Sequence, residues 1–141
     1  MLASANRGKE AILTGNDSIV IKKYISGIEG GRTLDVAGYL LTNVVAGSVA
    51  IQKTDGTYAP MPIKKDGKNE DDTDKYVYDT LPAGAKYVGI VYRSVSTIDG
   101  TASIMFDGVV NEALLPYGFD AIKSAFATAC PHIIFQNDEE A

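Results

Sequence analysis

The chain has 141 residues, of which 45% are hydrophobic and 22% are charged, and its formal net charge is −5. This length corresponds to one domain, which can bury enough apolar surface to fold without a disulfide or a metal. The acidic balance argues against nucleic acid as a partner, and no apolar run is long enough for a membrane span. We therefore expect a soluble protein that is made in a cytoplasm.

Cysteine and histidine each occur once, as Cys130 and His132. One cysteine excludes an internal disulfide and a cysteine-based zinc site, and one histidine excludes a histidine-rich metal site. With a single histidine, the chain also has few residues that could form the nucleophile–base pair of a catalytic site. We expect no catalytic residue, no metal and no cofactor, and hence a protein that is not an enzyme.

The first half of the chain predicts short strands joined by turns. Its glycines belong to a set of fourteen spread along the whole chain, which is typical of many tight turns. Residues 1–16 show no periodicity and predict a flexible N-terminal arm, followed by a single β-rich domain over residues 17–141. Within that domain, residues 18–25 and 44–51 predict strands, the second with a bend at Gly47.

Asp-Gly pairs between strand-like segments are the strongest turn signals. Residues 87–95 are apolar on both faces and predict a central strand, and residues 102–106 predict the strand that returns beside it. Residues 59–63 carry two prolines and predict a sheet edge or an extended connection, whereas residues 64–75 lack large apolar side chains and predict a solvated loop. The three predicted turns are at Asp55-Gly56, Asp99-Gly100 and Asp107-Gly108.

The C-terminal part changes character. Asn111 is a good helix-capping residue and Pro116 ends a helix, so residues 111–115 predict one helical turn. Residues 119–129 are rich in alanine, carry apolar side chains at three- to four-residue spacing and predict a helix, and residues 133–135 predict a last strand. The expected fold class is mainly β, barrel- or sandwich-like, with one C-terminal helix.

Several groups of residues suggest chemistry, but each has a more ordinary structural interpretation. Cys130 and His132 are two positions apart, and Asp107 and Glu112 could form a carboxylate pair such as glycoside hydrolysis uses. The acidic residues within 70–74 lack the pattern of a calcium loop. Eight tyrosines could line a sugar-binding face, although tyrosine also suits half-buried strands.

Residues 87–135 resemble a known family as a unit. The order is a strand, an Asp-Gly turn, a second strand, a short turn, a helix and a final strand. The most specific part consists of Gly108, Asn111, Glu112, Ala113 and Leu114. This pattern resembles the tailed-phage head decoration proteins of the lambda capsid-stabilising type, together with the related head fiber proteins of phages and prophages.

The resemblance implies a homotrimeric structural protein made in the bacterial cytoplasm and bound to the outer surface of a virion capsid. Its partners would be further copies of itself and the phage major capsid protein. The N-terminal arm, around Ala11, Ile12 and Leu13, is the expected capsid contact, because an extended apolar segment can add to a sheet edge. The alternative is a carbohydrate-binding or adhesion module that recognises host-surface glycans. A small hydrolase that uses Asp107 and Glu112 is a third hypothesis.

Overall fold

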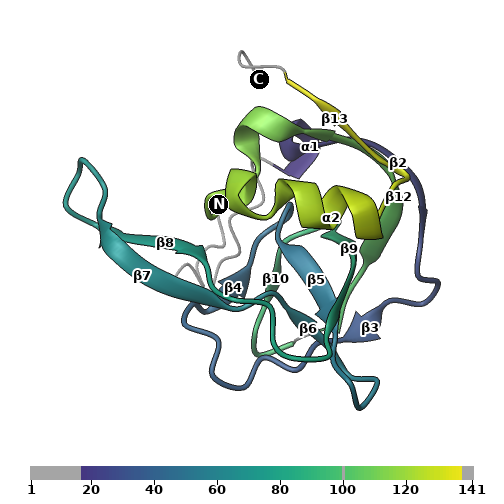
Figure 1. The fold of residues 1–141 in the computed structure, drawn as a ribbon, viewed down its shortest axis with the longest axis horizontal. Coiled ribbons are helices and arrows are strands. Elements are labelled where there is room, and N and C mark those ends of the chain that lie inside the picture. Colours follow the sequence, from purple (N-terminus) through teal and green to yellow (C-terminus); the bar gives the residue numbers. More distant parts are fainter. Residues whose placement is uncertain (1–16, 100, 138–141) are drawn as a thin grey trace, which may run out of the picture.

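The computed structural model describes residues 17–99 and 101–137, and within them short strands predominate (Figure 1). The mainly β fold with one helix near the C-terminus is confirmed. The elements in chain order are α1 (Asp17–Val20), β2 (Ile21–Gly27), β3 (Arg32–Thr33), β4 (Asn43–Val44), β5 (Val49–Gln52), β6 (Tyr58–Pro60), β7 (Ile63–Lys68), β8 (Asp74–Tyr78), β9 (Lys86–Val91), β10 (Val95–Ser96), β11 (Thr101–Ala102), β12 (Ile104–Asn111), the 3-10 turns η2 (Glu112–Leu114) and η3 (Phe119–Ala121), α2 (Lys123–Ala129) and β13 (Ile133–Gln136).

The largest sheet is six-stranded and is organised around β12. Its strand order is β13-β12-β9-β5-β6, and β2 also pairs with β12. All of these pairings are antiparallel except that of β12 with β13, which is parallel. The described residues also form three two-stranded pairs, β10-β4, β11-β3 and β7-β8. Val44 of β4 and Ala102 of β11 pack in a second core cluster with Ala50, Val91 and Ile104 of the main sheet. The predicted central strand over residues 87–95 is confirmed as far as Val91, because β9 lies between β12 and β5 and its last three residues are buried. The strand ends there, and Val95 belongs to the short strand β10 outside the main sheet.

Two of the local signals in the first half were interpreted correctly. The Asp55-Gly56 turn joins β5 to β6, with the Lys53 amide donating to the Thr57 carbonyl over 2.8 Å. Gly56 has a φ of 89°, which a residue with a side chain rarely adopts. The proline-containing strand β6 ends the strand order of the sheet, as expected for a strand with no amide to donate at Pro60.

The predicted turn at Asp107-Gly108 is wrong, because both residues lie inside the eight-residue strand β12. Their pairing with β2 is irregular, with register shifts on both sides of Asp107. A bulge of this kind lets a strand bend without ending. The second Asp-Gly turn falls partly on Gly100, which is outside the described residues.

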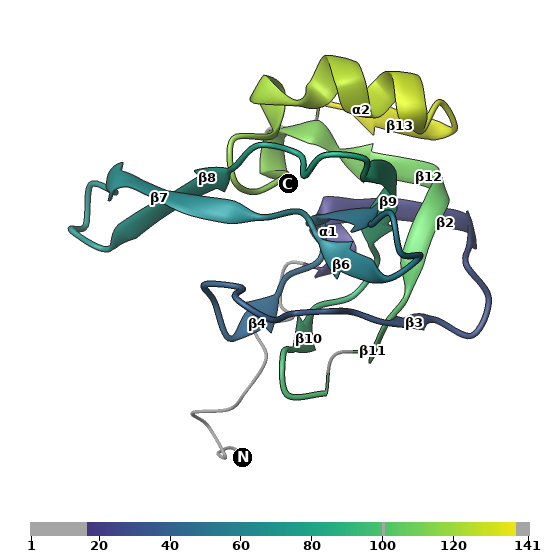
Figure 2. The same cartoon turned by 60° about the horizontal axis from the view of Figure 1, so that its bottom comes forward.

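The predicted solvated loop over residues 64–75 is also wrong. These residues form most of the hairpin β7-β8, which projects from the rest of the protein (Figures 1 and 2). The side chains are solvated as expected, but the backbone still pairs across the hairpin, and Asp74 binds Lys65 and Lys68 in ion pairs. Charged side chains fit a strand whose faces are both in water. Similarly, the strand expected from residue 18 begins only at Ile21, after the short helix α1.

The C-terminal helix closes the main core. Phe126 is fully buried and makes edge-to-face contacts with Tyr87 and Phe119, at centroid distances of 5.8 and 5.5 Å. Cys130 ends the helix before Pro131, as the sequence predicts. Within the described residues, no helix is long and apolar enough to cross a membrane.

Replacing Phe126 with alanine should destabilise the protein by about 3–5 kcal/mol, because it removes a ring at the centre of the core. Urea unfolding monitored by circular dichroism measures the change. The matched control is Ile98→Ala, since Ile98 is 84% exposed and should change stability by no more than about 0.5 kcal/mol. Equal losses in the two variants would contradict the assigned core.

Candidate functional site

Gly108, the first residue of the family-like segment, lies where β2 crosses close to β12. A Cβ atom placed on Gly108 would stand 2.5 Å from the Lys23 carbonyl oxygen and 2.5 Å from the Met105 sulfur. Real side chains do not fit at such distances, so the close approach of the two strands requires glycine here. The role of Gly108 is therefore packing inside the sheet and not the opening of a turn.

The next residues of the segment build a short capped turn. Asn111 is fully buried, and its side-chain oxygen accepts a hydrogen bond from the Ala113 amide over 3.3 Å. This confirms the predicted cap, although the turn is a 3-10 helix. Glu112 binds Lys123 of α2 over 2.7 Å, which ties the turn to the helix. Ala113 and Leu114 are exposed, so they are available to a partner.

The structure does not assemble a nucleophile from Cys130 and His132. Cys130 is buried, and burial raises the pKa of its thiol to about 11. His132 is exposed beyond the end of the helix, where its backbone carbonyl accepts a hydrogen bond from the Gly108 amide. A thiol with this pKa stays protonated at neutral pH, and the thiolate is the reactive form.

Asp107 and Glu112 are likewise not a catalytic pair. Four residues of β12 lie between them, and five steps of extended chain put their Cα atoms at most about 16 Å apart. Glycoside hydrolases hold their carboxyl groups about 5 to 9.5 Å apart. Glu112 is also engaged by Lys123. The ion pair with Lys123 gives Glu112 a structural role in this fold.

The acidic residues of 70–74 lie in and after the tip of the β7-β8 hairpin. Asp71 accepts hydrogen bonds from the amide and hydroxyl of Thr73, which hold the pKa of its carboxyl below the ordinary value. Asp74 faces Lys65 and Lys68. Within the ranges that the structure describes, no group of three or more metal-ligating side chains comes together.

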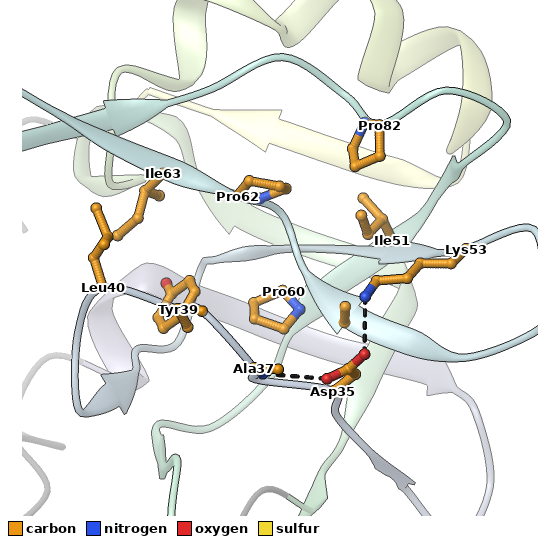
Figure 3. Close-up of a pocket in the computed structure, with 12 residues that line it drawn as sticks. Asp35, Ala37, Tyr39, Leu40, Ile51, Lys53, Pro60, Pro62, Ile63 and Pro82 are labelled. Atoms are coloured by element: carbon orange, nitrogen blue, oxygen red, sulfur yellow. Dashed lines mark hydrogen bonds and ion pairs between the residues drawn. The ribbon is translucent and has the colours of Figure 1, made fainter.

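An apolar groove lies beside the edge strand β6, and sequence reasoning did not find it (Figure 3). Its volume is about 330 Å³. Tyr39 and Leu40 stand on one side of it, and Pro62 and Pro82 lie across from them. Leu40 is 51% exposed, so this groove presents apolar surface to solvent. The lining residues are Asp35, Ala37, Gly38, Tyr39, Leu40, Ile51, Lys53, Ala59, Pro60, Pro62, Ile63 and Pro82.

One end of the groove is charged. Lys53 donates to Asp35 over 2.8 Å, and the Ala37 amide donates to the same carboxylate (Figure 3). The Lys53 bond is the largest cause that holds the pKa of Asp35 below its ordinary value, followed by the amide bond. Lys53 and Asp35 are 18 residues apart in the sequence, so no short sequence pattern predicts their ion pair. Only the prolines, which predict an edge, indicated this region.

The tyrosines are mainly packing residues, with one exposed exception. Tyr78 is buried, and its hydroxyl accepts a hydrogen bond from the Val49 amide. By contrast, Tyr24 is 40% exposed and lies against Tyr92 at a centroid distance of 4.6 Å. The guanidinium of Arg93 stacks over Tyr92 at 4.9 Å.

The expected capsid contact at Ala11, Ile12 and Leu13 lies outside the described residues. Comparisons with known proteins add no assignment: no family model matches the chain, and neither a curated protein nor a solved structure gives a significant match.

In the folded protein, Cys130 should resist alkylation by iodoacetamide at pH 8 and react fully once urea exposes it. The reason is burial, which both shields the sulfur and raises the pKa of the thiol. Mass spectrometry measures the reaction, and His132→Ala should leave its rate unchanged. Fast alkylation of the native thiol that is lost in His132→Ala would instead indicate an activated nucleophile.

Proposed function

We propose that this protein is a structural virion protein of the phage head decoration or head fiber type. It acts as a homotrimer on the outer surface of a phage or prophage capsid and stabilises that surface. The proposal rests on the resemblance of residues 87–135 to these proteins.

The observation that carries the proposal is the structural role of the family-like residues. Gly108 permits the close crossing of two strands, and Asn111 caps the turn that follows. Glu112 fixes this turn to α2. The residues that carry the resemblance therefore set the shape of a sheet and its turn. This is expected of a family whose members share a binding architecture and do not share a catalysed reaction.

The groove beside β6 supplies a surface for the capsid contact. It is apolar along its length and charged at one end, so it suits an apolar segment of the major capsid protein that carries a charged residue. Many copies, each bound with modest affinity, would together resist expansion of the shell through multivalency. The N-terminal residues Ala11, Ile12 and Leu13 would add a second contact.

Cosedimentation with expanded capsids of the encoding phage or prophage tests this function. The protein should bind in a saturable manner, with a stoichiometry in multiples of three at the three-fold sites. Leu40→Asp, which places a charge at the groove, should weaken binding about tenfold or more, whereas Ile98→Asp, at another exposed position, should not. Absence of cosedimentation at saturating protein would contradict the proposed function. If Leu40→Asp binds capsids as the wild type does, the capsid contact lies outside the groove.

A second candidate function is favoured by the exposed Tyr24, which packs against the half-buried Tyr92 beside the exposed Arg93. Aromatic faces of this kind bind the apolar faces of sugar rings, and a capsid-bound protein could use them to attach a virion to host-surface glycans. On a glycan array, the protein would then bind a defined group of glycans, and Tyr24→Ala would abolish the signal. An array without signal, or one in which Tyr24→Ala binds equally well, would remove this candidate.

A further inference from the structure

Two hydroxyl groups lie inside the protein beside the groove. Tyr39 forms part of the groove wall, where its ring packs against the main core (Figure 3). The oxygen of its hydroxyl is buried, although the ring borders the groove. Ser48, in the segment that leads into β5, is only 1% exposed. Both side chains therefore place a polar atom where bulk solvent does not reach.

These two hydroxyls have no direct partner in the fold. Among the residues that the structure describes, they are the two buried side-chain polar atoms without a hydrogen bond. The backbone of Ser48, by contrast, is fully bonded, because its amide donates to the Val45 carbonyl over 3.1 Å and its carbonyl accepts from the Val91 amide over 2.8 Å. A buried hydroxyl without a partner loses the hydrogen bonds that it made to water, so native proteins rarely keep one.

A third hydroxyl, that of Tyr117, lies close to both. The Val49 amide, next to Ser48, donates to the Tyr78 hydroxyl over 2.9 Å, and the Tyr78 ring meets the Tyr117 ring edge-on at a centroid distance of 5.5 Å. Burial is the largest cause that raises the pKa of Tyr39, and Tyr117 is the next. Burial also raises the pKa of Tyr117, whereas Tyr39 and Ser48 lower it. The three hydroxyls are therefore close neighbours.

The chemistry of this group of hydroxyls indicates what binds between them. A neutral hydroxyl both donates and accepts hydrogen bonds, and so does water. An ion buried here would need an opposite charge, which three neutral hydroxyls do not supply. Polar groups that are close together without bonding directly are often bridged by a water molecule. A buried water needs two to four polar partners, and this group offers three.

We propose that one ordered water molecule is bound inside the protein between the hydroxyls of Tyr39, Ser48 and Tyr117. Its hydrogen bonds supply the partners that Tyr39 and Ser48 lack. The water links the wall of the groove to the segment before β5 and to the residues that lead into η3. The inference goes beyond the proposed function, because the water site depends on these three hydroxyls and not on what binds in the groove.

A high-resolution crystal structure of the full chain is the direct test. It should show density for one water oxygen within about 3.2 Å of at least two of the three hydroxyl oxygens. Hydroxyls that bond directly to one another, with no density between them, would overturn the proposal. Density for a water that touches only one of the three would overturn it as well.

Thermal unfolding of Ser48→Ala tests the same site in solution. Because the substitution removes one partner of the bound water, the melting temperature should fall by about 3–5 °C. A hydroxyl that has no partner predicts the opposite, an unchanged or higher melting temperature, and that result would overturn the proposal. Ser94→Ala is the reference variant, because the buried Ser94 hydroxyl accepts a hydrogen bond from the Ala46 amide over 2.9 Å and its loss should lower the melting temperature.

A double-mutant cycle tests whether Tyr39 and Ser48 share one water. Tyr39→Phe and Ser48→Ala should each lower the melting temperature, and the chain that carries both changes should lose less than the sum of the two effects. The reason is that the first substitution already weakens the binding of the shared water. Circular dichroism checks that each variant is folded. Effects that simply add would contradict a shared water.

Discussion

The pairing of β12 along both of its edges holds this protein together. One edge pairs with β2, and the other pairs first with β9 and then with β13. Ile104, Met105 and Val110 of this strand are fully buried, so the same residues that supply the ladder also supply the core. Loss of this strand would leave three others without their common partner.

The bulge in β12 explains how one strand can serve three neighbours. The register shifts around Asp107 bend the strand, and Gly108 allows β2 to approach it closely. Beyond the bend, Asn111 caps a turn that leads into the C-terminal helix, and Glu112 binds that helix through Lys123. The helix then brings Phe126 against the sheet. Exposed apolar side chains remain at Ile25 of β2, at Ile134 of β13 and at Leu40 beside the groove.

Sequence reasoning recovered the elements whose signals are local. The Asp55-Gly56 hairpin, the buried strand β9 and the Asn111 cap each depend on neighbouring residues, and each was predicted. It failed where long-range pairing decides: the Asp107-Gly108 pair looks like a turn, but β2, about 80 residues earlier in the chain, holds it in a strand. The groove depends on Asp35 and Lys53 meeting across 18 residues, and no short pattern encodes that.

We propose that copies of this protein bind a phage capsid through the groove beside β6. Cryo-electron microscopy of capsids mixed with the protein is the most direct measurement. It should show density at the three-fold symmetry sites of the capsid, with the β6 groove facing the shell. Isolated copies scattered over the capsid, or capsids with no added density, would contradict the account.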